Sequence, residues 1–261
     1  MAATKREREQ ARKRQEKWEA RRAQTRARRR RTWAIVAIFA VLALVGGTLV
    51  VSGLGGASPS DDAPSASPQA AGDCPAASTE ARTGPALPDP SAAEDRTWTA
   101  TLDLCAGGVE SPVVIELDGA AAPQAVASFV SLADAGYYDG TACHRLTTSG
   151  IYVLQCGDPT GTGSGDPGYS YGPVENAPAD DVYPAGTVAM ARVGDDGESM
   201  GSQFFIVYQD STIPADAAGG YTVLGTVTSG LDAVQAVADA GLAEDQVSPA
   251  TPVIIEGVET Q

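Results

Sequence analysis

A run of 19 uncharged, mostly apolar residues at positions 33–51 divides the chain into two parts of opposite charge. Positions 5–31 hold 14 of the 18 Lys and Arg residues and carry a net charge of +10, whereas the rest of the chain carries −25. A helix of this length suffices to cross a hydrocarbon layer of ~30 Å. The whole-chain charge of −15 therefore describes two regions that belong in different compartments.

The orientation of this predicted span follows from four consecutive arginines, residues 28–31, that precede it. Segments rich in Lys and Arg next to a span stay in the cytoplasm. We therefore predict a basic cytoplasmic segment at 1–32, a single transmembrane helix at 33–54 in the cell membrane, and an extracytoplasmic remainder. The alternative is a cleavable secretory signal, but its apolar region is usually only ~7–15 residues long, so the length of the run favours a retained anchor.

The basic segment at residues 5–31 is rich in helix formers and polar on nearly every side, which predicts a solvated or membrane-surface helix. Its cations suit anionic lipid headgroups, at ~1 kcal/mol for each basic residue near the surface. A topology signal without any ligand explains the segment equally well. We do not expect nucleic acid as a partner.

Residues 55–95 are dominated by Ala, Pro, Ser, Gly and Asp and contain almost no large apolar side chains. Such a segment buries too little surface to fold by itself, so we predict a disordered extracytoplasmic tether. Cys74 is the exception, because a disulfide from Cys74 to the folded part would pin down the end of the tether.

All four cysteines follow the predicted span and would lie in an oxidising compartment, where two disulfides are expected. They are Cys74, Cys105, Cys143 and Cys156. Three connectivities are possible, and the sequence does not choose among them. If Arg145 and Gln155 share one face of a hairpin, strand alternation places Cys143 on that face and Cys156 on the opposite one, so a direct bridge between them is not assured. Buried free thiols are the alternative, and the spacings predict no metal site.

From residue 97 onward the pattern changes to short runs of β-branched and aromatic residues bounded by Gly, Pro and Asp, which predicts an all-β sandwich or barrel. Two helical stretches interrupt these runs, at residues 123–135 and 231–240, where apolar residues recur three or four positions apart. Gly136 follows the first of them, as expected past a helix end. We assign residues 96–261 to one folded domain, which is long enough to bury a single core.

The exported part contains only four Arg, no Lys and a single His. In so acidic a region Arg145, inside an apolar strand, requires an explanation, and a salt bridge to a nearby carboxylate is the simplest structural one. His144 alone is more typical of a satisfied core or hairpin residue than of a general base. Because there is no second His and no nucleophile elbow, the sequence does not support a hydrolytic triad.

Six short segments occur in the order in which the cyclophilins have them, and together they are specific. They are His144-Arg145 and residues 155–158, 161–165, 189–191, 201–206 and 221–225. The exported domain, from about residue 97 to 259, therefore resembles a cyclophilin-type peptidyl-prolyl cis/trans isomerase of the membrane-anchored bacterial form. The resemblance implies a mainly β fold, a closed eight-stranded antiparallel β-barrel capped by two α-helices.

The resemblance also implies an activity, rotation about X–Pro bonds without a cofactor. Arg145 would be the catalytic residue, donating toward the prolyl nitrogen as amide conjugation is lost, and Gln155 would position its guanidinium. Phe205 would form the floor of the proline pocket. The other residues expected to bind substrate are Gln203, Ala191 and the main chain of Arg192, which would hold the preceding peptide segment, together with His144, Tyr152, Val153, Ile213 and Tyr221.

Several residues depart from the family pattern. Arg145 and Gln155 are ten positions apart, two more than usual, which predicts a longer loop between them. Tyr152 stands where the family has a pocket Phe. Arg192 replaces a common Asn and would add charge at the rim of the pocket, and Tyr221 replaces a His. The Trp associated with tight cyclosporin binding has no clear counterpart, so we expect low cyclosporin sensitivity.

The expected partners are proline-containing segments of unfolded or exported proteins, whose folding X–Pro isomerisation can limit. One alternative is a binding module or chaperone that recognises such segments with little turnover, as the altered pocket would allow. A third class, an envelope protein that binds cations or cell-wall polymers through its acidic surface, would be indifferent to Arg145.

Overall fold

The computed structural model describes residues 74–261, which fall within one compact unit. The predicted basic segment, the membrane span and the first part of the tether lie outside the described residues. Within residues 74–261, none of the helices combines the length and the apolarity needed to cross a bilayer. The assignment of residues 33–54 to a membrane span therefore stays a prediction.

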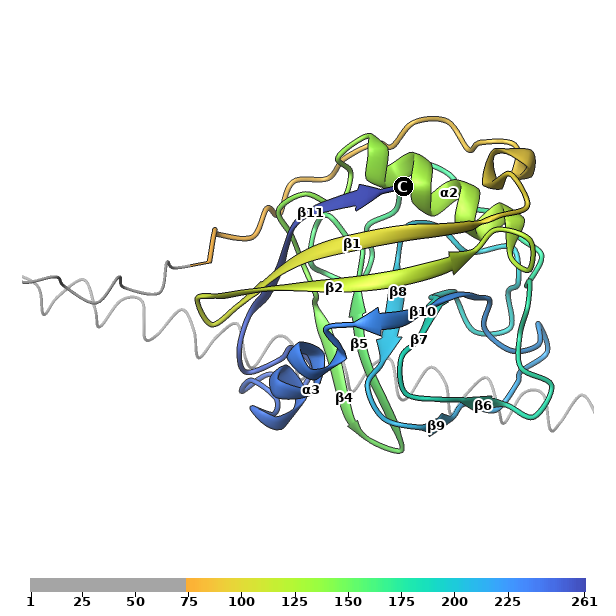
Figure 1. Cartoon of the computed structure of the whole chain (residues 1–261). Helices are drawn as coiled ribbons and strands as arrows, with labels where there is room; N and C mark the ends of the chain where they lie inside the picture. The colour runs from red at the N-terminus through yellow and green to blue at the C-terminus, as the bar shows by residue number, and fades with distance from the viewer. Residues whose placement is uncertain (1–73) are drawn as a thin grey trace, which may run out of the picture. The chain divides into compact units, whose positions relative to one another are not determined.

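A nine-stranded antiparallel sheet curls around the core of this unit (Figure 1). Its strands are β1 (Thr97–Ala106), β2 (Val109–Asp118), β3 (Thr141–Ala142), β4 (Arg145–Ser149), β5 (Ile151–Cys156), β7 (Thr187–Met190), β8 (Phe204–Val207), β10 (Val223–Ser229) and β11 (Val253–Thr260). The spatial order is β3–β11–β1–β2–β10–β7–β8–β5–β4. A separate two-stranded sheet pairs β6 (Val182–Tyr183) with β9 (Ser211–Thr212).

The sheet differs from the closed eight-stranded barrel that the family resemblance implied. It has nine strands, and its order ends at β3 and β4, which follow each other in the sequence. The chain that leads into β11 crosses the seam between these two edges. The Leu146 amide on β4 donates to the Val247 carbonyl at 2.8 Å, whereas on the other side of the seam the Cys143 amide donates to the Val253 carbonyl at 2.9 Å and extends the β3–β11 pairing. The result is a half-barrel whose seam is bridged by irregular main chain.

Two helices pack against the main core where the sequence predicted them, at different ends of the curled sheet (Figure 1). α2 (Pro123–Asp134) begins with Pro123, whose missing amide proton is not needed in a first turn, and Gly136 follows its end with φ +65°. Eight of the 12 residues of α2 are buried. α3 (Leu231–Asp239) buries Val234 and Val237. Apolar periodicity was therefore sufficient to locate both helices.

Strand alternation gives β8 two apolar faces. Phe204 and Ile206 belong to the main core inside the curl of the sheet, whereas Phe205 and Val207 belong to a second apolar cluster. The other buried members of this second cluster are Val153, Tyr183, Ala189 and Ile213. Because β8 is covered on both faces, its sequence is continuously apolar. The second cluster provides the apolar base of the site described below.

Residues 74–89, here called the strap, contact the folded unit before the short 3-10 helix η1 (Pro90–Ala93). Cys74 is disulfide-bonded to Cys105 in β1, and the Gly84 amide donates to the Pro167 carbonyl at 2.9 Å. The Arg82 guanidinium donates to the carbonyls of Gly136, Tyr137 and Asp139, just past the end of α2. The last part of the predicted tether is therefore ordered on the domain and pinned by Cys74, which corrects the expectation of disorder for residues 74–93.

Candidate active site

The β4–β5 hairpin places Arg145 and Gln155 directly opposite each other. The Arg145 guanidinium donates a hydrogen bond of 3.1 Å to the side-chain oxygen of Gln155. Residues 145–149 pair without interruption with residues 151–155, and Gly150, with φ +78°, makes the turn. The two additional positions between Arg145 and Gln155 therefore lengthen the paired strands, which corrects the expectation of a longer loop.

A chain of side-chain amides continues from this pair. The Gln155 amide nitrogen donates to the Gln203 side-chain oxygen at 2.9 Å, and the Gln203 amide nitrogen donates to the Gly165 carbonyl at 3.0 Å. Gln155 accepts at its oxygen and donates at its nitrogen, so both ends of its amide are engaged. The guanidinium is thus fixed through two neutral residues to the glycine-rich loop at 161–165.

A small cavity of about 160 Å³ opens beside the Arg145 guanidinium. It is lined by Arg145, Ile151, Val153, Gln155, Ala191, Arg192, Phe205, Ile213 and Tyr221. Phe205 is only 5% exposed, and the Tyr221 ring meets it edge-to-face with centroids 5.5 Å apart. The cavity therefore combines an apolar base with two guanidinium groups and one amide. Its volume suits a single apolar side chain, since pockets for drug-sized ligands are about 300–1,000 Å³.

A second, larger cavity of about 620 Å³ continues from the first. Both are lined by Gln155, Ala191 and Arg192, and Gln203 adjoins them. The glycine-rich loop, residues 163–166, forms another side of the larger cavity. An extended peptide that inserted one side chain into the small cavity would therefore have room for neighbouring residues in the large one.

Arg145 and Arg82 are the two arginines of residues 74–261 that have no carboxylate partner in that range, and of these two only Arg145 lines the small cavity. Arg82 donates to three carbonyls, Arg96 pairs with Glu94 at 2.9 Å, and Arg192 pairs with Asp216 at 2.8 Å. Within the described residues no carboxylate lies within 4.0 Å of Arg145, although that range contains 26 Asp and Glu. The structure therefore does not support a salt bridge as the reason for this arginine.

His144 lies beside the glycine-rich loop. Both ring nitrogens are buried without a hydrogen-bond partner, and burial lowers the pKa of the imidazole, opposed by the negative charge of Asp158. Asp158 itself is fully buried and accepts from the side chain and amide of Thr160 and from the amide of Ser164. Burial raises the pKa of Asp158, but these hydrogen bonds outweigh it and the pKa is lowered. Asp158 is therefore ionised, and its carboxylate holds the glycine-rich loop through these hydrogen bonds.

A comparison with known protein families identifies the family that has this site. Residues 101–260, more than half of the chain, match the family described as cyclophilin type peptidyl-prolyl cis-trans isomerase/CLD. The chain belongs to the cyclophilin family.

Relatives of this cyclophilin include a Mycobacterium tuberculosis protein named "Probable peptidyl-prolyl cis-trans isomerase B". It is 46% identical over 150 residues, which cover 52% of this chain and 47% of that protein. The Mycobacterium leprae protein of the same name is 39% identical over 183 residues, covering 65% of this chain and 60% of that protein. The chain thus spans about half the length of these relatives.

A solved structure confirms the fold of this cyclophilin. The crystal structure of a Cryptosporidium parvum cyclophilin type peptidyl-prolyl cis-trans isomerase has a TM-score of 0.53 and 24% sequence identity, and the similarity covers 64% of this chain and 98% of that chain. At this identity the likeness concerns the fold alone.

The cyclophilin fold brings most of the predicted site residues to the small cavity. Arg145, Val153, Gln155, Ala191, Arg192, Phe205, Ile213 and Tyr221 line it, and Gln203 adjoins it through Gln155. Ile151 also lines the cavity and was not predicted. Ile151 lies two residues before Val153 on β5, so strand alternation was the signal that could have identified it.

Three predicted site residues differ from expectation. Tyr152 has the opposite strand parity and packs against the main core, with its ring 5.9 Å from that of Tyr208. His144 contacts the glycine-rich loop and does not line the small cavity. The Arg192 side chain is 0% exposed and paired with Asp216, so it adds no free charge at the rim. No pattern in the sequence identifies Asp216 as its partner.

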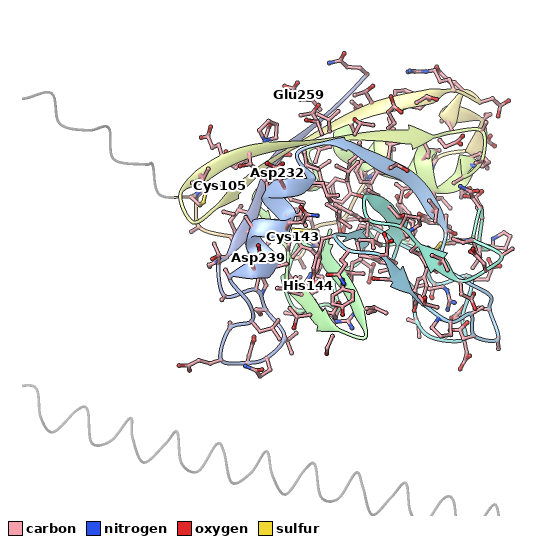
Figure 2. The ribbon with its side chains drawn as sticks, turned by 60° about the horizontal axis from the view of Figure 1, so that its bottom comes forward. Cys105, Cys143, His144, Asp232, Asp239 and Glu259 are labelled. Carbon is pink, nitrogen blue, oxygen red and sulfur yellow. A yellow bond between two sulfur atoms is a disulfide. The ribbon has the colours of Figure 1, made fainter. Side chains whose placement is uncertain are left out.

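Both predicted disulfides form, and one pairing contradicts the parity argument. Cys74 bonds to Cys105, which lies near the tip of the β1–β2 hairpin, and Cys143 bonds to Cys156 (Figure 2). Side-chain alternation does not hold before β4, because Cys143 is buried in the main core together with Cys156, whereas Arg145, two residues later, is exposed. The Cys143–Cys156 bridge therefore adjoins both residues of the Arg145–Gln155 pair.

Proposed function

We propose that this cyclophilin catalyses cis/trans isomerisation of X–Pro bonds in unfolded or newly exported proteins. The observation that carries the proposal is the Arg145 guanidinium, which lies at the small apolar cavity and is held by the neutral Gln155. The Phe205 ring at the base of this cavity is the desolvated surface that a pyrrolidine ring would cover.

The chemistry requires no bond to be made or broken. The barrier of ~18–20 kcal/mol arises from amide resonance, and it falls when the twisted amide is bound better than either planar isomer. As the X–Pro bond twists, the nitrogen lone pair leaves conjugation and becomes a hydrogen-bond acceptor. A guanidinium fixed beside an apolar surface stabilises this changing dipole without reorganising. Because Gln155 carries no charge, it holds Arg145 in place without neutralising it.

The flanking peptide would lie in the larger cavity. Gln203 and Ala191 lie where the peptide segment before the proline would pass, and the Gln203 amide is already oriented by Gln155 and Gly165. No cofactor has a role in this mechanism. The substrate class is therefore defined by the proline and an extended main chain.

We place the domain outside the membrane, joined to an anchor at residues 33–54 by the part of the predicted tether that precedes the strap, with the N-terminus in the cytoplasm. Two disulfides support this placement, because such bonds persist in oxidising compartments and are rare in the cytosol. The segregation of charge, +10 before the apolar run and −25 in the rest of the chain, supports the same orientation. Anionic lipid headgroups are the proposed contact of residues 5–31.

The test compares Arg145→Ala with wild type in a protease-coupled cleavage assay on a proline-containing tetrapeptide, using the full chain in detergent micelles. Removing one preorganised donor costs ~10²–10³ in rate for comparable sites, so we expect kcat/KM to fall about 100-fold. Arg96→Ala is the matched control, because Arg96 is an exposed arginine bonded to Glu94 and remote from the cavity.

Two outcomes contradict the proposal. If Arg145→Ala retains the wild-type rate, the guanidinium is not the catalytic group. If wild type gives no rate above the uncatalysed reaction but binds the tetrapeptide, the protein is the catalytically weak proline-binding chaperone that the substitutions in the pocket, such as Tyr221, would allow.

A further inference from the structure

The Arg192 side chain is a buried cation whose five N–H donors are all engaged. Its two terminal nitrogens form a bidentate ion pair with Asp216 at 2.9 and 2.8 Å. The remaining donors bind the main-chain carbonyls of Val193, Gly219 and Gly220. The guanidinium holds the pKa of Asp216 well below its usual range. A planar fork bound in this way has one orientation only.

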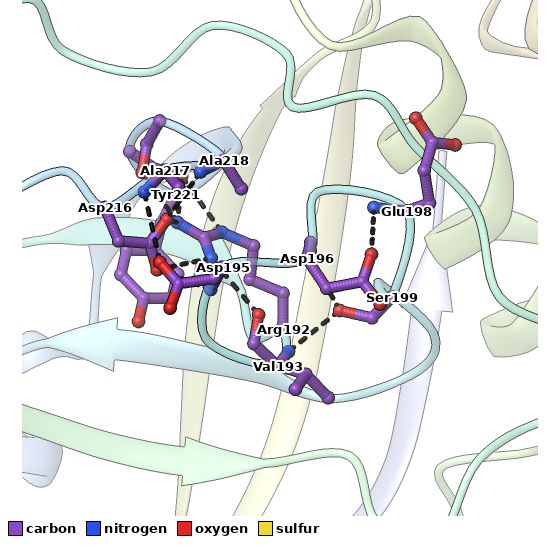
Figure 3. A network of polar contacts seen from close by, with 12 residues as sticks. Arg192, Val193, Asp195, Asp196, Glu198, Ser199, Asp216, Ala217, Ala218 and Tyr221 are labelled. Atoms are coloured by element: carbon purple, nitrogen blue, oxygen red, sulfur yellow. Dashed lines mark hydrogen bonds and ion pairs between the residues drawn. The ribbon is translucent and has the colours of Figure 1, made fainter. Parts of the chain in front are cut away.

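The ion pair belongs to a network that joins two loops lining the cavities (Figure 3). Asp216 also accepts from the amides of Asp195 and Ala218, each at 2.9 Å. In the opposite direction, the Asp195 carboxylate accepts from the Ala217 amide at 3.2 Å. The loop that follows β7 and the loop that follows β9 are therefore cross-linked through Asp195 and Asp216.

Tyr221 lies between this network and the base of the small cavity. The Arg192 guanidinium carbon is 4.6 Å from the Tyr221 ring centroid, and the Phe205 ring lies 5.5 Å from the same centroid. The Tyr221 amide is fixed separately by the Tyr183 hydroxyl at 2.7 Å. The main chain of Tyr221 is thus anchored by one residue, and the ring is held by Arg192 from one side.

We propose that Arg192, through its ion pair with Asp216, is a positioning residue that holds the Tyr221 ring as a wall of the proline pocket. The role rests on the proposed function, since it concerns how that pocket receives a prolyl ring. Arg192 acts on the shape of the pocket, whereas Arg145 acts on the twisting amide. Its loss therefore weakens substrate binding in the planar and twisted states alike, which raises KM and leaves kcat nearly unchanged.

The experiment measures kcat and KM separately for Arg192→Met, Asp216→Asn and Tyr221→Ala in the full chain, with thermal unfolding recorded for each. We expect Arg192→Met to raise KM about tenfold with kcat within about twofold, and Asp216→Asn to act in the same direction. Arg96→Met is the matched control. Arg96 also pairs with a carboxylate and lies over an aromatic ring, 3.5 Å from the Trp98 centroid, but lines neither cavity.

A double-mutant cycle separates positioning from general destabilisation. If Arg192 acts through Tyr221, then Arg192→Met adds little to the KM of Tyr221→Ala. Additive effects, or a loss of kcat at constant KM, overturn the proposal. If Arg192→Met does not fold, Arg192→Lys in the same cycle decides the question, because it keeps the cation over the ring and loses the bidentate geometry.

The peptide affinity distinguishes this proposal from the proposed function. If wild type proves inactive, the dissociation constant of the tetrapeptide is measured by NMR titration for the same set of single and double variants. Weaker binding by Arg192→Met that disappears in the Tyr221→Ala background supports the positioning role even then. Unchanged affinity in Arg192→Met overturns it.

Discussion

Removing the Cys143–Cys156 bridge should reduce activity more than removing Cys74–Cys105, although it should reduce stability less. In the chain-entropy description, a crosslink over 13 residues contributes about 2.9 kcal/mol and one over 31 residues about 3.7 kcal/mol at 25 °C. For a domain of this size each kcal/mol corresponds to ~2–4 °C in melting temperature. On stability alone, the Cys74–Cys105 bridge should therefore have the greater effect.

The two bridges differ in their distance from the catalytic pair. Cys143 lies two residues before Arg145, and Cys156 directly follows Gln155, so this bridge fixes the ends of the strands that carry both side chains. A displacement of about 1 Å in a catalytic group can cost ~100-fold in rate, so we expect the loss of this bridge to lower kcat/KM about tenfold. Cys74 fastens the strap, which contributes no residue to the small cavity.

The measurement compares two double variants, Cys143→Ala/Cys156→Ala and Cys74→Ala/Cys105→Ala, by thermal unfolding and by tetrapeptide isomerisation. Both are assayed at a temperature at which both remain folded. The reasoning is refuted if the two variants lose equal activity, or if the first variant is folded and retains the wild-type rate.

Two further predictions follow from the charges. Burial lowers the pKa of His144 in the folded protein below 6.5, the usual value for the unfolded chain. Between these two pKa values the unfolded chain binds a proton more readily than the folded protein does. The free energy of unfolding therefore falls as the pH drops through this window. Between pH 7 and 5 the free energy of unfolding, measured with urea, should change less in His144→Gln than in wild type. An equal change in both proteins would contradict this prediction. Protease added to intact expressing cells should digest residues 96–261 and spare residues 1–32, and a protected domain would contradict the proposed orientation.

Local patterns were sufficient wherever one chain segment determines its own structure. The two helices follow from apolar residues that recur with the helical period, and Gly136 follows the first helix. The contact between Arg145 and Gln155 was implied by the family resemblance, and the register of one hairpin places the two residues opposite each other. These predictions succeeded because helix and hairpin geometry depends on neighbours in the sequence.

Features that depend on distant segments could not be predicted from those patterns. The Cys143–Cys156 pairing depends on how the chain enters β4, and the open seam depends on where the segment before β11 runs. Arg192 was expected at the rim because its replacement of a smaller residue suggested added charge. Its partner Asp216 is 24 residues away on another loop, and only the folded arrangement brings the two together.

The acidity of the domain sets the two arginines of the small cavity, Arg145 and Arg192, in contrast. Residues 74–261 carry a net charge of −22, so a guanidinium at the surface of this domain is surrounded by potential partners. A carboxylate in reach of Arg145 would neutralise the cation that the proposed mechanism requires. Asp216 belongs to a loop that contributes to the same cavity, and Arg192 occupies both of its oxygens. The neutral Gln155 therefore holds Arg145 without neutralising it, whereas Arg192 is neutralised by Asp216.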